Sequence, residues 1–189
     1  MKGLKSIFFV LCAMFLLSLT ISAQAREEYR GTAISFNGPR LETAFFNLRI
    51  NGHTSDEQAR QYLGVLQESG QDRALDAIRN QNLGSFSIGN GIGRTINVVR
   101  ESTTNGQRRI FIVFERWTRF AEVRGGYRSL DYPFGVIELF IDENTGKGTG
   151  TYIAAAKIKF DRDDNQVEIE NFATYPVKLT NVQRSGAGR

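Results

Sequence analysis

The sequence predicts an α+β fold, in which an antiparallel sheet of about 8–9 strands is curled into a sandwich or a partial barrel and a helical pair at about 55–82 packs on one side. Three observations support this prediction. Apolar and polar residues alternate with a period of two along most of the chain, as in half-buried strands. One segment changes to the roughly 3.6-residue period of an amphipathic helix. Turn signals such as Asn105-Gly106 and Asn144-Thr145-Gly146 separate most candidate strands.

The first 25 residues have the three parts of a secretory signal peptide. Lys2 and Lys5 form a positive start, residues 7–17 are wholly apolar, and Ala23-Gln24-Ala25 is a small-x-small cleavage site. The apolar run is shorter than the roughly 20 residues of a membrane-spanning helix, and an uncleaved anchor is the alternative. We therefore expect export through the inner membrane, to the periplasm or the medium.

Cleavage of this segment would change both the cysteine content and the charge of the chain. Cys12 is the only cysteine, so the mature protein would lack disulfides, thiolate nucleophiles and Cys-ligated metals. Loss of Lys2 and Lys5 would leave 22 of the 24 basic residues against 20 acidic ones, a formal net charge of +2 in place of +4. This near balance favours neither nucleic acid nor, after cleavage, a membrane as a partner. The remainder predicts a single globular domain at 26–182 and a flexible tail at 183–189.

Two strands are predicted before the helical segment, on either side of a turn signal at 37–39. Alternate residues in each strand share one face: Thr32, Ile34 and Phe36 in the first, and Ala44, Phe46, Leu48 and Ile50 in the second. Later strands are predicted at 83–88, 94–101, 108–117, 134–142, 149–160, 166–173 and 176–182. Because residues 110–114 are continuously apolar, we expect that strand to be covered on both faces.

The helical segment is predicted as two pieces, 55–69 and 72–82. Thr54 with Glu57 matches a capping box at its start. Gly70 is a candidate C-cap or kink, after which Asp72 can begin the second piece. One face of the first piece carries Ala59, Tyr62, Leu63 and Leu66.

One antiparallel pairing can be predicted in register, across a turn at 161–166. The opposed pairs would be Phe160–Val167, Lys159–Glu168, Ile158–Ile169 and Lys157–Glu170. Each such pair contributes roughly 0.2–1 kcal/mol. A slip by one residue would set lysines against apolar residues, so this register is favoured over its neighbours.

Several short motifs are closer to structural features than to catalytic sites. The single histidine, His53, lies in a turn and cannot build a multi-histidine metal site. Ser87 lacks the first glycine of a nucleophile elbow, and Arg94 replaces the third glycine of a dinucleotide loop at 89–94. The acidic run 161–165 lacks the glycine and the final glutamate of a calcium loop. No cofactor and no metal is predicted.

The most unusual stretch, 108–134, interleaves arginines with aromatic residues. Its part 118–133 is irregular, and loops longer than about 12–15 residues are often functional. Arginine forks bind carboxylates or phosphates, and aromatic faces stack on rings or sugars. The alternative is structural, with the arginines paired to Glu115, Glu122 and Asp131. We predict contacts to an anionic or sugar-like ligand in the loop 116–132, from Arg116, Trp117, Arg119, Arg128 and Tyr132.

Several short sequence segments occur in a fixed order between about residues 43 and 182. They are Gly70-Gln71-Asp72-Arg73-Ala74-Leu75, Asp131-Tyr132-Pro133-Phe134-Gly135, Gly148-Thr149-Gly150-Thr151 with Ala155-Ala156-Lys157, and Glu170-Asn171-Phe172 leading into Pro176-Val177-Lys178-Leu179-Thr180. In this order they resemble a group of exported bacterial proteins of unknown function. The resemblance implies a bacterial, exported protein and carries over no activity and no site.

These observations predict an exported, non-catalytic domain that binds a small-molecule or cell-envelope ligand through the loop 116–132. One alternative is a cell-envelope hydrolase with a carboxylate pair such as Glu122 and Asp131, whose spacing depends on the fold. Another is a structural component of the envelope or a barrel in the outer membrane, because alternating strands also fit such barrels.

Overall fold

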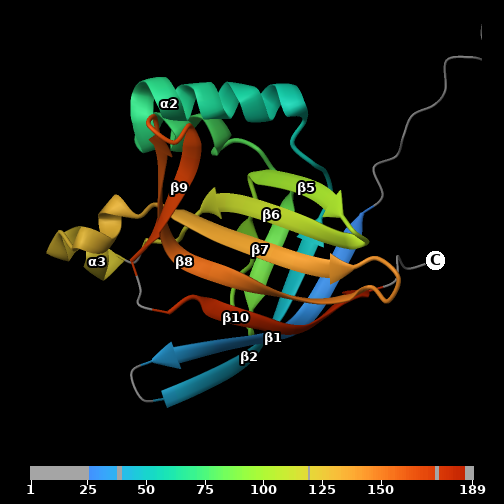
Figure 1. Cartoon of the computed structure of the whole chain (residues 1–189). Helices are drawn as coiled ribbons and strands as arrows, with labels where there is room; N and C mark the ends of the chain where they lie inside the picture. The colour runs from blue at the N-terminus through green and yellow to red at the C-terminus, as the bar shows by residue number, and fades with distance from the viewer. Residues whose placement is uncertain (1–25, 38–39, 119, 173–174, 186–189) are drawn as a thin grey trace, which may run out of the picture.

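The computed structural model describes residues 26–37, 40–118, 120–172 and 175–185. The predicted signal peptide therefore lies outside the described residues, as do Arg119 and the four residues after Ser185. Within the described part, the chain forms one sheet of ten strands and a long helix that lies across one face of it (Figure 1). The predicted combination of an antiparallel sheet with a helical segment on one side is confirmed.

The sheet is antiparallel throughout, in the order β4-β3-β2-β1-β10-β8-β7-β6-β5, with β9 paired to β8 outside this order. Its strands are β1 (Glu27–Asn37), β2 (Arg40–Ile50), β3 (Gly84–Ile88), β4 (Arg94–Thr95), β5 (Val98–Thr104), β6 (Gln107–Glu115), β7 (Phe134–Asp142), β8 (Lys147–Asp161), β9 (Gln166–Asn171) and β10 (Val177–Ser185). The helices are α2 (Asp56–Ile78), the short α3 (Phe120–Gly125) and a 3-10 turn, η1 (Arg128–Asp131).

The two ends of this order, β4 and β5, are separated in the chain by only Ile96 and Asn97. Among the described residues they do not pair with each other, so the sheet is open. The sheet must nevertheless curl until its two edges come together at this point. The curl creates an inner face, which it encloses, and an outer face, part of which lies under α2 (Figure 1).

The same two residues explain why there are ten strands where about 8–9 were predicted. The predicted strand 94–101 is divided at Asn97, a buried residue that is only 3% exposed. Its side chain donates to the carbonyls of Arg79 and Gln81, at 3.3 and 2.8 Å, and accepts from the Glu115 N–H at 3.0 Å. Because these partners are distant in sequence, alternation along the strand does not reveal the bend.

The inner face encloses the larger of two apolar clusters. Four rings lie close together there, and the centroid separations between Phe46 and Phe86, Phe86 and Phe114, Phe86 and Tyr152, and Phe114 and Tyr152 run from 5.0 to 6.1 Å. The cluster also contains residues of β6 and β7, among them Ile110, Ile112, Ile137, Leu139 and Ile141. A Cβ on Gly135 would lie 2.5 Å from the Phe114 ring, so this position has no room for a side chain.

The strand β6 is covered on both faces, as its continuous apolar run predicts. Ile110, Ile112 and Phe114 belong to the inner cluster. The intervening Phe111 and Val113 belong to the second cluster, on the outer face. The alternation of a strand therefore sends neighbouring residues into two different cores.

The first hairpin has its predicted inner face in β2, where Phe46, Leu48 and Ile50 are buried. In β1, the buried apolar side chains are Tyr29 and Ala33. The shared face of Thr32, Ile34 and Phe36 is the opposite, outer one, and Phe36 is 51% exposed.

The helix begins one residue later than the predicted capping box. Ser55, not Thr54, is the N-cap, and its hydroxyl accepts from the Gln58 N–H at 3.1 Å while the Gln58 side chain accepts from the Ser55 N–H. Thr54 is buried, and its hydroxyl instead accepts from the Val99 N–H at 3.0 Å. Both positions fit the capping-box pattern, and packing against β5 decides between them.

The predicted helical pair is a single run, Asp56–Ile78, kinked at Gly70. This residue has φ 79° and ψ −176°, a conformation that suits glycine. The helix ends at Ile78, so residues 79–82 of the predicted second piece are not helical.

The predicted register of the β8–β9 hairpin is confirmed at all four pairs, from Phe160–Val167 to Lys157–Glu170. The charge contact differs in detail, because Lys159 Nζ lies 3.0 Å from the Glu170 carboxylate, diagonally across the pair. At the other end of the domain, β10 continues to Ser185. The prediction of a flexible tail from 183 is therefore wrong for its first three residues, which pair with β1 and β8.

Candidate ligand-binding site

The helix α2 covers part of the outer face of the sheet and forms the second apolar cluster with it. Leu66, Leu75 and Ile78 of the helix are buried in this cluster together with residues of β6, β7 and β8. The β8–β9 hairpin reaches the helix at one end of this layer (Figure 1), where Arg162 donates to the Gln67 carbonyl at 3.0 Å.

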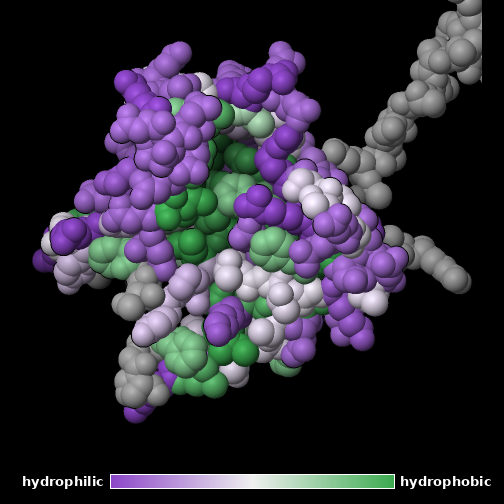
Figure 2. All heavy atoms as spheres, viewed as in Figure 1, coloured by the Kyte–Doolittle hydropathy of each residue, from purple (hydrophilic) through white to green (hydrophobic). Residues whose placement is uncertain are grey.

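The helix does not fill the space that it covers. A cavity of about 250 Å³ lies between α2 and the sheet. Figure 2 shows it as a hollow in which hydrophobic side chains lie beneath the hydrophilic outer surface of the helix. The lining is apolar except for the side chains of Tyr62 and Arg100. It consists of Ala59, Tyr62, Leu63, Leu66, Ala74, Ile78, Val98, Arg100, Phe111, Val113, Phe134, Ile158 and Val167.

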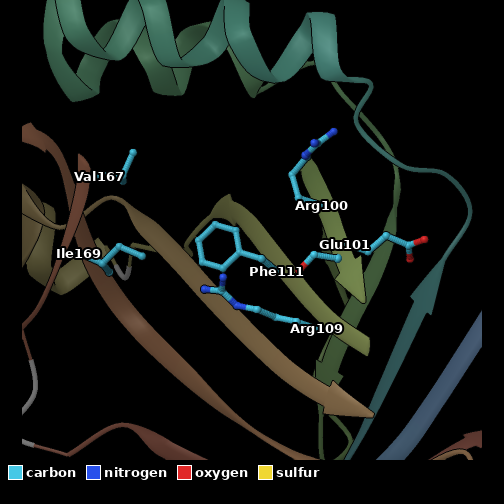
Figure 3. A pocket seen from close by; sticks show the side chains of 7 residues that line it. Arg100, Glu101, Arg109, Phe111, Val167 and Ile169 are labelled. Atoms are coloured by element: carbon cyan, nitrogen blue, oxygen red, sulfur yellow. The ribbon is translucent and has the colours of Figure 1, made fainter. Parts of the chain in front are cut away.

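A wider opening of about 410 Å³ lies beside the cavity. The two spaces share Arg100, Phe111 and Val167 in their linings, so they adjoin each other, and we refer to them together as the cleft. Figure 3 shows Val167 and Ile169 of β9 on one side of the opening and Arg100 of β5 on the other, with Phe111 and Arg109 of β6 between them. The opening is thus apolar on the β9 side and charged along β5 and β6, where Arg100, Arg109 and Glu101 line it.

Arg100 is held at the rim by the start of the helix. It donates to the Thr54 carbonyl at 2.8 Å and to the Asp56 carboxylate at 2.6 Å. The hydrogen bond from this guanidinium lowers the pKa of Asp56 below its usual value. Arg100 therefore fixes the helix start to β5, and its aliphatic stem lines the cavity.

Arg109 is the more available cation of the opening. Its Nε donates to the Glu138 carboxylate at 2.5 Å, and its side chain is 53% exposed. Within the described part of the chain, neither of its two terminal nitrogens has a hydrogen-bond partner. The guanidinium carbon lies 6.0 Å from the centre of the Phe111 ring, which also lines the apolar cavity. A cation and the entrance to an apolar space are therefore adjacent.

A separate network of charges closes the inner face near the start of β1. The buried Glu27 carboxylate accepts from Tyr29 at 2.7 Å and pairs with Arg108 and Arg184, each at 3.0 Å. Burial acts to raise the pKa of Glu27, but these hydrogen bonds and positive charges outweigh it and hold the pKa below its usual value. Glu27 comes from β1, Arg108 from β6 and Arg184 from β10, so these ion pairs hold three strands together.

Among the residues predicted as ligand contacts, Arg116 and Tyr132 are engaged within the protein. Arg116 donates to the carbonyls of Tyr132 and Ser129, both at 2.6 Å. Tyr132 is buried, and its hydroxyl donates to the Glu170 carboxylate, which raises the pKa of the Tyr132 phenol. Arg116 thus ties the loop to the end of β6, and Tyr132 connects it to β9.

Trp117 remains a surface residue, 60% exposed. The guanidinium of Arg94 lies 4.0 Å from the centre of its ring, beside a polar hollow of about 460 Å³. Arg128 is exposed, and Arg119 lies outside the described residues. The structure thus brings Trp117 together with Arg94, which the sequence placed in a different feature.

The acidic residues in the middle of the chain, which include the two proposed for hydrolysis, make separate contacts. Glu115 pairs with Arg79, with both carboxylate oxygens at 3.1 Å from guanidinium nitrogens, and Glu138 pairs with Arg109. Asp131 is exposed, and the side chain of Glu122 lies outside the described residues.

The remaining short motifs have structural contacts. His53 Nε2 lies 3.2 Å from the Glu101 carboxylate, next to the network around Glu27. In the acidic turn, Asp161 accepts from the N–H groups of Asp163 and Asp164, at 2.8 and 3.3 Å, so its carboxylate closes the turn. Ser87 lies in β3, opposite Asn47.

Comparisons of the chain with models of known protein families, with curated proteins and with solved structures found no match. In the part of the chain that the structure describes, no three or more histidine, cysteine or acidic residues are grouped so that they could hold a metal ion. No described helix is long and apolar enough to cross a membrane.

Sequence reasoning missed the cleft because its lining comes from six separate elements, α2 and β5 to β9. One local signal was present. Ala59 and Ala74 are small residues on the face of the helix that meets the sheet, where larger apolar residues would fill the space.

Proposed function

We propose that this chain is an exported, non-catalytic domain that binds a small amphiphile with an apolar tail and an acidic head. The observation that carries the proposal is that the apolar cavity under α2 adjoins an opening whose lining includes Arg100 and Arg109. Export is inferred from the signal-peptide pattern of residues 1–25.

The tail would occupy the cavity. A volume of about 250 Å³ is just below the roughly 300–1,000 Å³ typical of small-molecule sites, which suits a short chain. Burial of an apolar chain against this lining is favourable by about 25 cal/mol per Å². With only Tyr62 and Arg100 as polar side chains, the lining offers a chemically inert wall, which supports binding rather than hydrolysis.

The head would lie in the opening, against Arg109. A guanidinium presents a planar fork of donors that matches a carboxylate or a phosphate. Glu138 engages only Nε, so the terminal nitrogens are the donors for a ligand. Because Arg109 is next to Phe111, which lines the cavity, one short molecule can reach both.

The proposal is tested by titration calorimetry of residues 26–189 with decanoate and with decanol. The substitution Ala74→Leu fills the cavity, so we expect it to abolish binding of both probes. The matched control Ala154→Leu places the same side chain on an exposed position of β8 and should bind as the wild type does. Circular dichroism shows whether each variant is folded.

Arg109→Gln tests the head group. We expect decanoate to bind at least about tenfold more weakly, because a hydrogen bond to a charged group contributes roughly 1.5–3 kcal/mol. Binding of decanol should change little. Absence of binding of both probes to the wild type, or undiminished binding to folded Ala74→Leu, would contradict the proposal.

A second candidate is favoured by the contact between Arg94 and Trp117. An exposed indole beside a cation, above a polar hollow, suits an anionic sugar, the ligand class expected for the loop 116–132. Trp117 is the single tryptophan, so its fluorescence reports directly on this surface. Glucuronate should quench it. Titration calorimetry, which does not need the indole, should show that Trp117→Ala with Arg119→Ala abolishes binding while the melting temperature stays nearly unchanged. A flat fluorescence titration would exclude this candidate.

A further inference from the structure

The β1–β2 hairpin extends beyond the rest of the sheet. The pairing of β2 with β3 begins at Phe46, and the pairing of β1 with β10 ends at Ile34. Beyond these positions the strand pairing is only within the hairpin, which projects from the sheet at the lower left of Figure 1. One backbone contact to the rest of the chain remains at its base, where the Gly89 N–H donates to the Phe45 carbonyl at 2.7 Å. An isolated two-stranded ribbon is marginally stable in water. Packing within the domain therefore does not explain why the hairpin extends so far, whereas a contact outside the domain would explain it.

One face of this ribbon is apolar and exposed. Phe36 lies opposite Leu41, and these residues are 51% and 59% exposed. Phe45, on the same face, is 77% exposed, and Tyr175 lies beside Phe36 with a centroid separation of 6.1 Å and 67% exposure. Figure 2 shows hydrophobic side chains gathered in this region. We call Phe36, Leu41, Phe45 and Tyr175 the hairpin patch.

The charges next to the hairpin patch are positive. Lys178 lies opposite Ile34, and Arg30 lies two positions before Thr32 on the same outer face of β1. Both side chains are exposed, and among the described residues neither has a carboxylate partner. The acidic residue of the ribbon, Glu42, adjoins Leu41 in β2 and so faces the opposite side. The patch therefore combines aromatic and apolar side chains with a cationic flank.

We propose that the hairpin patch binds the surface of an anionic lipid bilayer. Aromatic side chains partition to the membrane interface, and each lysine or arginine close to an anionic leaflet adds to the attraction. The patch lies on a projecting ribbon, which a fluid interface can accommodate without a complementary shape. A stable protein interface needs roughly 20–30 residues on each side, far more than this patch supplies.

The proposal is independent of the ligand cleft, which lies under α2 on the outer face of β5 to β9. Its test uses residues 26–189, because every described strand and helix follows residue 25. The protein is sedimented with vesicles of phosphatidylcholine and with vesicles of phosphatidylcholine and phosphatidylglycerol. We expect binding to the anionic vesicles that falls as salt is added.

The double variant Phe36→Ser/Phe45→Ser should weaken this binding at least about tenfold, because it removes two apolar side chains from the lipid interface. Lys178→Gln should weaken it about fivefold and reduce its salt dependence. Val123→Ser removes a 58% exposed apolar residue from α3 and serves as the matched control, with unchanged binding expected. If the double variant does not fold, Leu41→Ser provides the same test at one position.

Three outcomes would overturn the proposal. The first is the absence of sedimentation with anionic vesicles at low salt, and the second is equal sedimentation by the folded double variant. The third is a dimer in sedimentation velocity that dissociates on Phe36→Ser/Phe45→Ser, which would assign the hairpin patch to contact between two copies of the chain.

Discussion

The two faces of the same sheet are packed in different ways. On the inner face, the sheet curls around its own side chains, and Phe46, Phe86 and Phe114 are at most 3% exposed. On the outer face, a single kinked helix covers the strands and leaves a cavity of about 250 Å³. A curled sheet surrounds its interior with several strands, whereas one helix presents only a stripe of side chains. The inner face is therefore suited to stability and the outer one to accepting a ligand.

The largest expected effect is a difference in stability between substitutions at two phenylalanines of β6, one on each face of the sheet. Phe114→Ala should lower the free energy of unfolding by about 3–5 kcal/mol, because it empties a close-packed site. Phe111→Ala should cost at most about 2 kcal/mol, since one side of that ring already faces the cavity. Urea denaturation measures both. Equal losses would show that the two faces do not differ in packing.

Next in size is the ion network that closes the inner face. Glu27→Gln removes the buried negative charge that Arg108 and Arg184 share, leaves Glu101 as the other carboxylate partner of Arg108, and should cost about 3 kcal/mol at neutral pH. The exposed Glu68→Gln in α2 is the control, with no change in the urea midpoint expected.

The same carboxylate gives the wild type a dependence on pH. The folded pKa of Glu27 is lowered, so its stabilisation is complete above the usual carboxylate pKa of about 4.5 and is lost as the pH falls through the folded value. Wild type should therefore lose more stability between pH 5 and pH 3 than Glu27→Gln does. Parallel losses in the two proteins would show that other acids control acid unfolding.

A matched pair of substitutions should have opposite consequences on the two faces. Ala33→Leu adds volume to the filled inner core and should destabilise the protein by about 1–3 kcal/mol. Ala74→Leu adds the same volume beside the cavity and should leave the melting temperature unchanged or raise it. Thermal unfolding followed by circular dichroism compares them. If Ala74→Leu destabilised as strongly, the cavity would not accept added volume.

The smallest effect concerns the hairpin at the edge of the cleft. Lys159 and Glu170 are both partly exposed, and their hydrogen bond raises the pKa of Lys159 and helps to lower that of Glu170. Lys159→Ala should lower the melting temperature slightly at low salt and not at high salt. Lys157→Ala should leave it unchanged at both. An equal effect of Lys157→Ala would favour the direct cross-strand pairs over the diagonal contact.

Much of the fold could be predicted because it depends on neighbours in sequence. The β8–β9 register follows from two apolar and two charged matches across a short turn, and the double burial of β6 follows from its unbroken apolar run. The candidate site could not be predicted in the same way. Arg116 has the residue type of a ligand contact, but its donors are engaged by the carbonyls of Tyr132 and Ser129.

The sequence by itself determined the alternation of the strands, the positions of most turns and the kink at Gly70, and it supplies the pattern from which we predict export. These features depend on side-chain periodicity and on backbone preferences that act over a few residues. Only the tertiary structure decided which face of β1 is buried, where the strand at 94–101 bends, and that α2 leaves a cleft beside Arg109. Each of these depends on contacts between segments far apart in the chain, where the volume and the hydrogen-bonding groups of one element determine what the other can do.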